Sequence, residues 1–226
     1  MAVRLCPSLR YSTEMVTVNL QYGREKASFT IHKSTISHHS PFFLAAFNGA
    51  FQEGQTQQMT LTDVDPKIFT IYVDWLYSQH ISPTFLSEKI FIQTQLLAHR
   101  FLSPRLCNEV LRAYNQLLKT PGVYPEMRYF NLAYENTVDG SPLRKYLASL
   151  AAGGRCSLGW KKKAHREVLE DILEWVKVNM RTWNGRSVRD YGEEELKMFF
   201  GGVGKTTKSI AREVGTVHGI PDRTAN

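Results

Sequence analysis

Residues 29–77 read FTIHKSTISHHSPFFLAAFNGAFQEGQTQQMTLTDVDPKIFTIYVDWLY and decide the fold. Phe29 and Ile31 alternate with polar neighbours, which is the period of a half-buried strand. Ser40-Pro41 is a helix-start signal and Gly49 is a stop signal, so a short helix is predicted between them. Asp65-Pro66 repeats the start signal for a helix that is apolar on nearly all sides and therefore belongs in a core.

The pattern extends upstream into a hairpin. Val16, Val18 and Leu20 alternate with polar residues and predict a first strand, and Tyr22-Gly23-Arg24 turns it into the strand that contains Phe29. A hairpin followed at once by helices indicates a small sheet with helices packed over it, an α+β arrangement.

Downstream, helical patterns fill the chain as far as about residue 200. Ser103-Pro104 starts a helix that Pro121-Gly122 breaks, and we place a domain boundary there. Further helices are predicted from Pro125 to Tyr134, from Ser141 to Gly153 and from Ala164 to about Arg181. The last of these carries an apolar stripe made of Val168, Leu169, Ile172, Leu173, Val176 and Met180.

These residues together resemble a known family, the BTB/POZ domain, and in particular the short BTB proteins typical of fungi. The resemblance is carried by His32-Lys33, the SPFF run at 40–43, Phe51-x-Glu53, the LTDVDP run at 61–66 and the WLY run at 75–77, which all occur in family order. It covers roughly residues 13–118 and implies a small β-sheet flanked by a cluster of α-helices. It also implies a protein-interaction module rather than an enzyme.

The predicted organisation has four parts. Residues 1–12 are expected to form a flexible arm, 13–120 a BTB/POZ domain, 121–200 an all-α C-terminal extension and 201–226 a disordered tail. The segment from Leu132 to Ala152 also resembles the helical region that follows the domain in many fungal members.

Composition narrows the classes of partner and compartment. The 226 residues carry a net charge of +7, but the only compact basic run is Lys161-Lys162-Lys163, which is the usual pattern of a solvated surface, and no nucleic-acid partner is expected. Three widely spaced cysteines argue against a disulfide framework and fit a reducing compartment. No apolar run is long enough for a membrane span and no secretory signal is evident. An intracellular protein, cytoplasmic or nuclear, is therefore expected.

The candidate binding residues are Phe51 and Glu53, which the sequence places in an exposed loop between the second helix and the strand near Met59. An aromatic anchor two residues from a carboxylate is a typical interface arrangement. In the BTB family the matching hydrophobic-x-Glu motif contacts the N-terminal helices of a cullin scaffold, so the resemblance implies that Phe51 is the buried anchor and Glu53 the polar contact. The alternative is that Phe51 closes the core and Glu53 is solvated.

Other chemistries have weaker support. Residues 201–207, GGVGKTT, resemble a phosphate-binding loop, but the strand–loop–helix context that such loops need is absent, so nucleotide binding is a remote alternative. His32, His38 and His39 have no acidic residue or cysteine beside them in sequence to complete a metal site. No nucleophile motif is present either. We therefore expect no catalytic residues, no metal and no cofactor.

Two functions remain open from the sequence. The first is an adaptor that links a partner or substrate to a cullin-type ubiquitin ligase through Phe51 and Glu53. The second is a homo-oligomerisation scaffold without ligase function, because residues 16–36 correspond to a two-fold dimer face in many family members. The short segment ahead of Val16 departs from dimers that exchange an N-terminal strand, so a homodimer is not secured.

Overall fold

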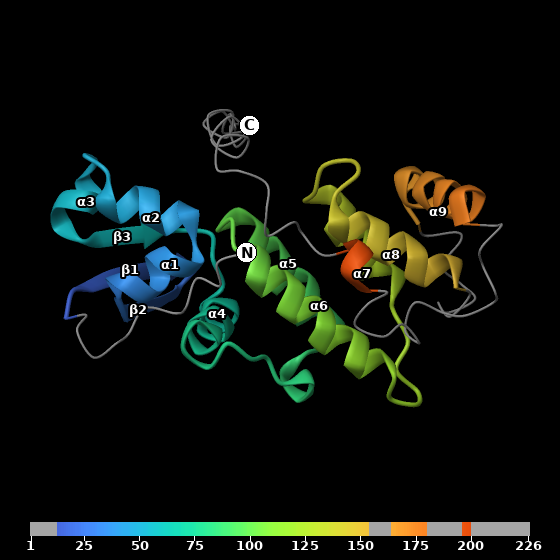
Figure 1. Ribbon diagram of the computed structural model, residues 1–226, viewed down its shortest axis with the longest axis horizontal. Coiled ribbons are helices and arrows are strands. Elements are labelled where there is room, and N and C mark those ends of the chain that lie inside the picture. Colours follow the sequence, from blue (N-terminus) through green and yellow to red (C-terminus); the bar gives the residue numbers. More distant parts are fainter. Residues whose placement is uncertain (1–12, 154–163, 180–195, 200–226) are drawn as a thin grey trace.

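The structure, a computed structural model, describes residues 13–153, 164–179 and 196–199. The predicted arm (1–12), the basic run (161–163) and the predicted tail with its GGVGKTT motif (201–207) lie outside the described residues. The elements follow one another along the long axis of the molecule: the sheet with α1–α3 at one end, α5 and α6 in the middle and α7–α9 at the other end (Figure 1).

The sheet has three strands in the order β2-β1-β3. They are β1 (Met15–Tyr22), β2 (Glu25–His32) and β3 (Gln58–Leu61). β1 and β2 are antiparallel with Val18 opposite Phe29, and β1 and β3 are parallel with Val18 opposite Met59. Gly23, at φ 60°, supplies the left-handed residue that the tight hairpin turn needs. The predicted hairpin and its alternating burial are confirmed.

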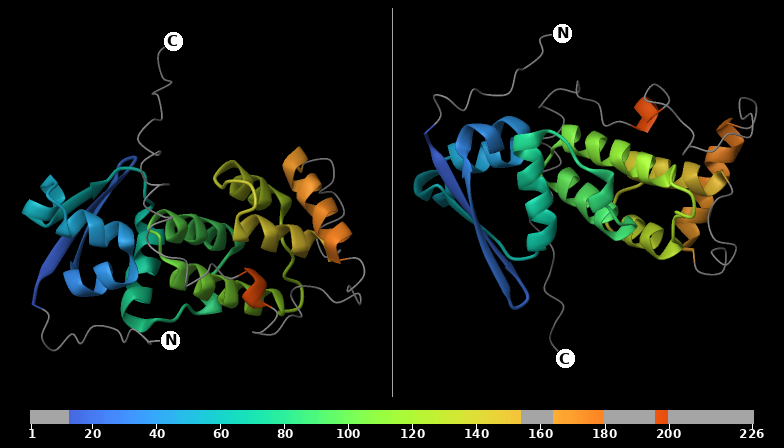
Figure 2. Two further views of the ribbon diagram at one scale, coloured as in Figure 1. Left: turned by 45° about the horizontal axis from the view of Figure 1, so that its top comes forward. Right: turned by 90° about the horizontal axis from the view of Figure 1, so that it is seen from below.

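Three helices connect β2 to β3, and one more follows β3. They are α1 (Lys33–His39), α2 (Pro41–Asn48), α3 (Gln52–Thr56) and α4 (Pro66–Ser78). Ser40 caps α2 by accepting a hydrogen bond from the Phe43 N–H, and Asp65 caps α4 by accepting one from the Lys67 N–H at 2.8 Å. Both predicted cap-plus-proline starts are therefore confirmed. Figure 2 shows α4 between the sheet and the α5–α6 pair.

The remaining helices form the middle and the far end of the molecule. They are α5 (Glu88–Arg100), α6 (Pro104–Leu118), α7 (Met127–Glu135), α8 (Pro142–Ala152) and α9 (Arg166–Asn179), with short 3-10 turns η2 (Pro83–Phe85) and η5 (Lys197–Phe199). The α+β class with a helical extension is confirmed. None of the described helices has both the length and the apolar character that a bilayer-spanning segment needs.

The apolar stripe predicted for residues 164–181 is only partly buried. Val168 and Ile172 are buried, but Leu173 is 59% exposed, and Met180 lies outside the described residues. α9 lies at the edge of the molecule and packs on α8 and α7, so only one narrow side of the helix is covered.

An aromatic cluster joins the sheet end to the middle helices. The ring of Phe101, at the end of α5, lies 4.7 Å from that of Phe43 and 5.2 Å from that of Tyr72, between centroids. The Phe101 carbonyl accepts a 2.6 Å hydrogen bond from Ser40 Oγ. Ser40 therefore both caps α2 and ties α2 to the end of α5.

The core continues from α5 and α6 into the C-terminal helices. Phe91 stacks on Tyr114 with a centroid separation of 3.9 Å, and Tyr146 of α8 packs against Phe91. Glu88, in the first turn of α5, accepts a 2.6 Å hydrogen bond from the Glu126 N–H just before α7. The boundary placed at Pro121 stays a prediction.

Replacing Ser40 tests the double hydrogen bond. Ser40→Ala should lower the free energy of unfolding by about 2 kcal/mol, because it removes the cap of α2 and leaves a buried carbonyl without its donor. Ser87→Ala is the control, since Ser87 is an exposed cap with one hydrogen bond to the Ile90 N–H, and it should cost about 1 kcal/mol or less. Urea unfolding measures both. Equal effects would show that the bond to Phe101 adds nothing.

The carboxyl of Glu88 should make stability depend on pH. Burial raises the pKa of Glu88 to about 8, and the carboxylate of Glu126 adds to the rise, while hydrogen bonds from the Glu126 N–H and Tyr114 and the charge of Arg128 oppose it. The folded chain thus holds this proton more tightly than the unfolded chain. The contribution of Glu88 to stability is full below about pH 4.5 and is lost as pH rises through about 8.

Glu88→Gln removes this dependence. The difference in free energy of unfolding between Glu88→Gln and wild type should shift in favour of the variant as pH rises from about 5 to 8. Glu25→Gln, at an exposed strand position, is the control and should show no such trend. Urea titrations at four pH values give the slopes, and parallel slopes for both variants would contradict the assignment.

Candidate functional site

The candidate partner surface is formed by the outer side of α2 and the start of α3. Its exposed residues are Leu44, Ala45, Asn48, Ala50, Phe51 and Gln52. Glu53 is the only charged residue between Pro41 and Leu61 in a chain with a net charge of +7. A surface that is apolar and nearly free of charge, with one carboxylate at its edge, has the composition of an interface centre.

Two glycines fix the position of Phe51. After α2 ends at Asn48, the chain turns through Gly49, and α3 folds back so closely that a Cβ on Gly54 would lie 2.0 Å from the Gly49 carbonyl oxygen. A Cβ on Gly49 would lie 2.7 Å from the Ala45 carbonyl oxygen. Only glycine fits these contacts, so the backbone that carries Phe51 is held by close packing.

Glutamine side chains complete the turn. Gln57 donates from Nε2 to the carbonyl oxygens of Phe47, at 3.1 Å, and of Gly54. Gln57 itself has φ 55°, a left-handed conformation that ends α3 and sends the chain into β3. The segment between α2 and β3 is therefore tied to the end of α2, which places Phe51 on a defined support.

Phe51 is 73% exposed, the most exposed of the large apolar side chains in the described part of the chain. Leu44, on the exposed side of α2, is 49% exposed. Glu53 is half-buried in the first turn of α3, where the helix dipole favours a carboxylate, and no described residue forms an ion pair with it. An exposed aromatic ring beside an available carboxylate can bind a partner that offers an apolar pocket and a basic or N–H donor.

Two sequence expectations about this surface are wrong. The segment after Phe51 is the five-residue helix α3 and not a loop, because Gly49 and Gly54 allow the chain to fold back on α2. The alternative in which Phe51 closes the core also fails, since the ring faces outward. The sequence reasoning did not identify Leu44 as part of this surface. Phe43 and Phe47 define the buried side of α2, and Leu44 lies off that side, so its exposure could have been predicted.

The histidines have structural roles in the described chain. Tyr77 Oη accepts a hydrogen bond from the His32 N–H at 3.2 Å and lies within hydrogen-bond distance of His32 Nδ1, at 3.0 Å. His39 is buried against Trp75, and burial together with the charges of His38 and Arg105 lowers its pKa to about 4. Among the residues that the structure describes, no three His, Cys, Asp or Glu side chains gather into a group that could hold a metal ion.

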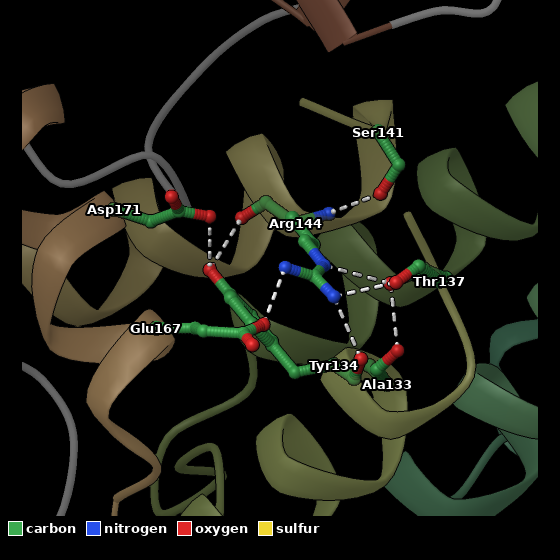
Figure 3. A network of polar contacts seen from close by, with 7 residues as sticks. All are labelled: Ala133, Tyr134, Thr137, Ser141, Arg144, Glu167 and Asp171. Carbon is green, nitrogen blue, oxygen red and sulfur yellow. Dashed lines mark hydrogen bonds and ion pairs between the residues drawn. The ribbon is translucent and has the colours of Figure 1, made fainter. Parts of the chain in front are cut away.

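A second polar centre, absent from the sequence predictions, joins α7, α8 and α9. Arg144 is 6% exposed, donates to the Tyr134 carbonyl at 2.8 Å and to Thr137 Oγ1 at 3.1 Å, and pairs with Glu167 at 2.8 Å (Figure 3). Its guanidinium also lies 4.5 Å from the centre of the Tyr134 ring.

The ring and hydroxyl of Tyr134 connect this centre to α9. Tyr134 Oη donates to Asp171 at 2.8 Å, and burial, followed by the Asp171 hydrogen bond and charge, raises the pKa of Tyr134. Arg144 thus donates to carbonyls at and just after the end of α7, while its partner on α9, Glu167, is acidic. No sequence signal marks it, because Arg144 lies inside an otherwise ordinary helix pattern.

Comparison with known proteins locates the resemblance. Residues 7–117 match the family model described as BTB/POZ domain. Kelch-like ECH-associated protein 1A of Danio rerio is 27% identical over 86 residues, which cover 38% of this chain but only 14% of that protein. The solved BTB domain of zebrafish PATZ1 aligns over 42% of this chain and 74% of its own, with 23% identity and a TM-score of 0.32. The matched region contains the α2–α3 surface and ends one residue before α6 does.

Breaking the Arg144 network should destabilise the C-terminal helices. Arg144→Met should lower the free energy of unfolding by about 2–4 kcal/mol, because it leaves buried carbonyls without a donor. Arg144→Lys should recover only part of the loss, since an ammonium cannot reproduce the guanidinium fork. Urea unfolding measures these changes, and amide hydrogen exchange should accelerate in α7–α9.

The matched control is Arg166→Met. Arg166 pairs with Glu170 at 2.7 Å, but its side chain is 90% exposed, so no measurable change is expected. If Arg144→Met left the free energy of unfolding as unchanged as Arg166→Met does, the Arg144 network would not contribute to stability.

Proposed function

We propose that this chain, which contains a BTB/POZ domain in residues 7–117, is a protein-interaction adaptor that links a partner or substrate to a cullin-type ubiquitin ligase. The observation that carries the proposal is the exposure of Phe51 beside Glu53 on a surface otherwise free of charge. The family resemblance assigns the hydrophobic-x-Glu motif to a cullin contact, and Phe51 and Glu53 occupy that motif here.

The geometry supports a helix-binding surface. Leu44 and Phe51 offer two apolar anchors, one on α2 and one beyond its C-terminal end, and the glycine-held turn keeps Phe51 exposed without a partner. Preorganisation of this kind lowers the entropic cost of association. Glu53 then adds one charge-assisted hydrogen bond and fixes the register of the partner.

The rest of the proposal follows from the same resemblance. The helices after residue 120 would bind the substrate. The protein would act inside the cell. The short fungal BTB proteins are the members of the family that its sequence resembles. Its role would be binding and not catalysis. Homo-oligomerisation without a ligase is the alternative that the experiment below separates.

Calorimetric titration of a cullin N-terminal domain into the full chain tests the adaptor function. Wild type should bind with micromolar or tighter affinity. Phe51→Ala should weaken binding by about 30-fold or more, the effect of losing about 2 kcal/mol at an aromatic anchor. Glu53→Gln should weaken it by about tenfold.

Tyr124→Ala is the matched control, because Tyr124 is another exposed aromatic residue, at 57%, in the segment before α7. It should bind as wild type does. If wild type fails to bind any cullin N-terminal domain, or if Phe51→Ala binds equally well, the adaptor function is wrong. Sedimentation analysis of the same sample then tests the oligomerisation alternative.

A further inference from the structure

A cavity of about 230 Å³ lies where α5, α6 and the start of α8 meet. Its walls are mainly apolar, with contributions from Ala98, Leu102, Leu111, Leu143 and Phe199. It therefore brings together side chains from the matched region, residues 7–117, and from the helices that follow it. The α2–α3 surface belongs to the end of the molecule that holds the sheet, whereas α5 and α6 form its middle (Figure 1).

One buried polar group in the cavity wall has no partner. Ser103 precedes Pro104 at the start of α6, and its sequence predicts a capping hydroxyl, but the structure shows no side-chain cap there. Ser103 is 1% exposed, and its Oγ makes no hydrogen bond with any described residue. Buried hydroxyls are almost always hydrogen-bonded, so an unpaired one that lines a cavity indicates a missing partner.

The other two hydroxyls in the wall already have partners. Ser141 Oγ accepts from the Arg144 N–H at 3.3 Å. Thr137 Oγ1 donates to the Ala133 carbonyl at 2.7 Å and accepts from Arg144 Nε at 3.1 Å (Figure 3). Among the hydroxyl groups of the wall, Ser103 is thus the one that makes no hydrogen bond with any described residue.

We propose that this cavity binds a small, uncharged molecule with an apolar body and a single hydroxyl or carbonyl group that hydrogen-bonds to Ser103. The volume suits such a molecule, because a cavity of about 150 Å³ binds benzene. The additional volume of this cavity would accommodate a short substituent on such a ring. The apolar walls disfavour a full charge. Burial by the same walls raises the pKa of the neighbouring Cys107 thiol.

The site has a structural consequence. Because its walls come from α5 and α6 on one side and from α8 and Phe199 on the other, a bound molecule would contact both and stabilise their packing. The proposal does not depend on cullin binding, since none of the residues of the α2–α3 surface lines the cavity.

Two probes of similar shape, 4-ethylphenol and 4-ethyltoluene, test the site on the full chain. The second carries a methyl group in place of the hydroxyl that would hydrogen-bond to Ser103. Amide chemical shifts are followed by NMR during titration. We expect 4-ethylphenol to shift amides of α5, α6 and the start of α8, with a dissociation constant below about 1 mM. The probe 4-ethyltoluene should bind the same residues more weakly.

Ser103→Ala separates a specific hydrogen bond from simple apolar filling. It should weaken 4-ethylphenol about fivefold, the equivalent of one neutral hydrogen bond, and leave the affinity for 4-ethyltoluene within about twofold. The unliganded variant should be as stable as wild type, because no hydrogen bond is lost. Ser87→Ala, a cap remote from the cavity lining, should change neither affinity.

Two further variants block the cavity itself. Ala98→Leu fills it from a fully buried position, and Leu96→Trp fills it from a half-buried one if the first variant does not fold. Either should abolish the shifts from both probes. The proposal is overturned if neither probe shifts the lining amides of wild type, if a folded blocking variant still binds, or if Ser103→Ala affects both probes alike.

Discussion

The arrangement of the helices depends on the packing of Phe101. Its ring touches aromatic side chains of α2 and α4, and its carbonyl oxygen accepts from Ser40. A single residue at the end of α5 thus joins the helices that cover the sheet to the helices that form the middle of the molecule. Aromatic rings bury large areas and fix mutual orientation, so this contact sets the relative position of α2, α4 and α5. The position of the α2–α3 surface therefore also depends on this packing.

The candidate partner surface on α2 and α3 shows how a side chain can be exposed and still held in a defined position. Phe43 and Phe47 anchor α2 in the core, which leaves Leu44 on the outer side of the same helix. The close approach of Gly54 to the Gly49 carbonyl then fixes the turn that carries Phe51. Exposing a phenylalanine to water is unfavourable for the isolated protein, and binding of the proposed partner would remove this cost.

The C-terminal helices are held by a different kind of interaction. Arg144 satisfies carbonyls at the end of α7 and pairs with an acidic residue on α9, so polar contacts supplement an apolar core that is thinner there. The cavity next to Ser103 lies where α8 meets α5 and α6. The closed polar network thus lies beyond the matched region, whereas Ser103, whose hydroxyl makes no hydrogen bond with any described residue, lies within it.

Most of the helices and strands, and several of their ends, could be predicted from the sequence. Alternation in residues 16–31 predicted the hairpin, and Ser40-Pro41 and Asp65-Pro66 predicted two capped helices, because periodicity and capping depend on residues close together in the chain. The three-dimensional structure was needed to show that Phe51 faces outward, that Glu53 lies in the first turn of a helix, that Leu173 is exposed and that the Ser103 side chain does not cap α6. The placement of Phe51 and Glu53 depends on how the chain folds back at Gly49 and Gly54, and the setting of Leu173, Ser103 and Arg144 depends on which distant segments pack against them. Periodicity and capping signals carry no information about such packing.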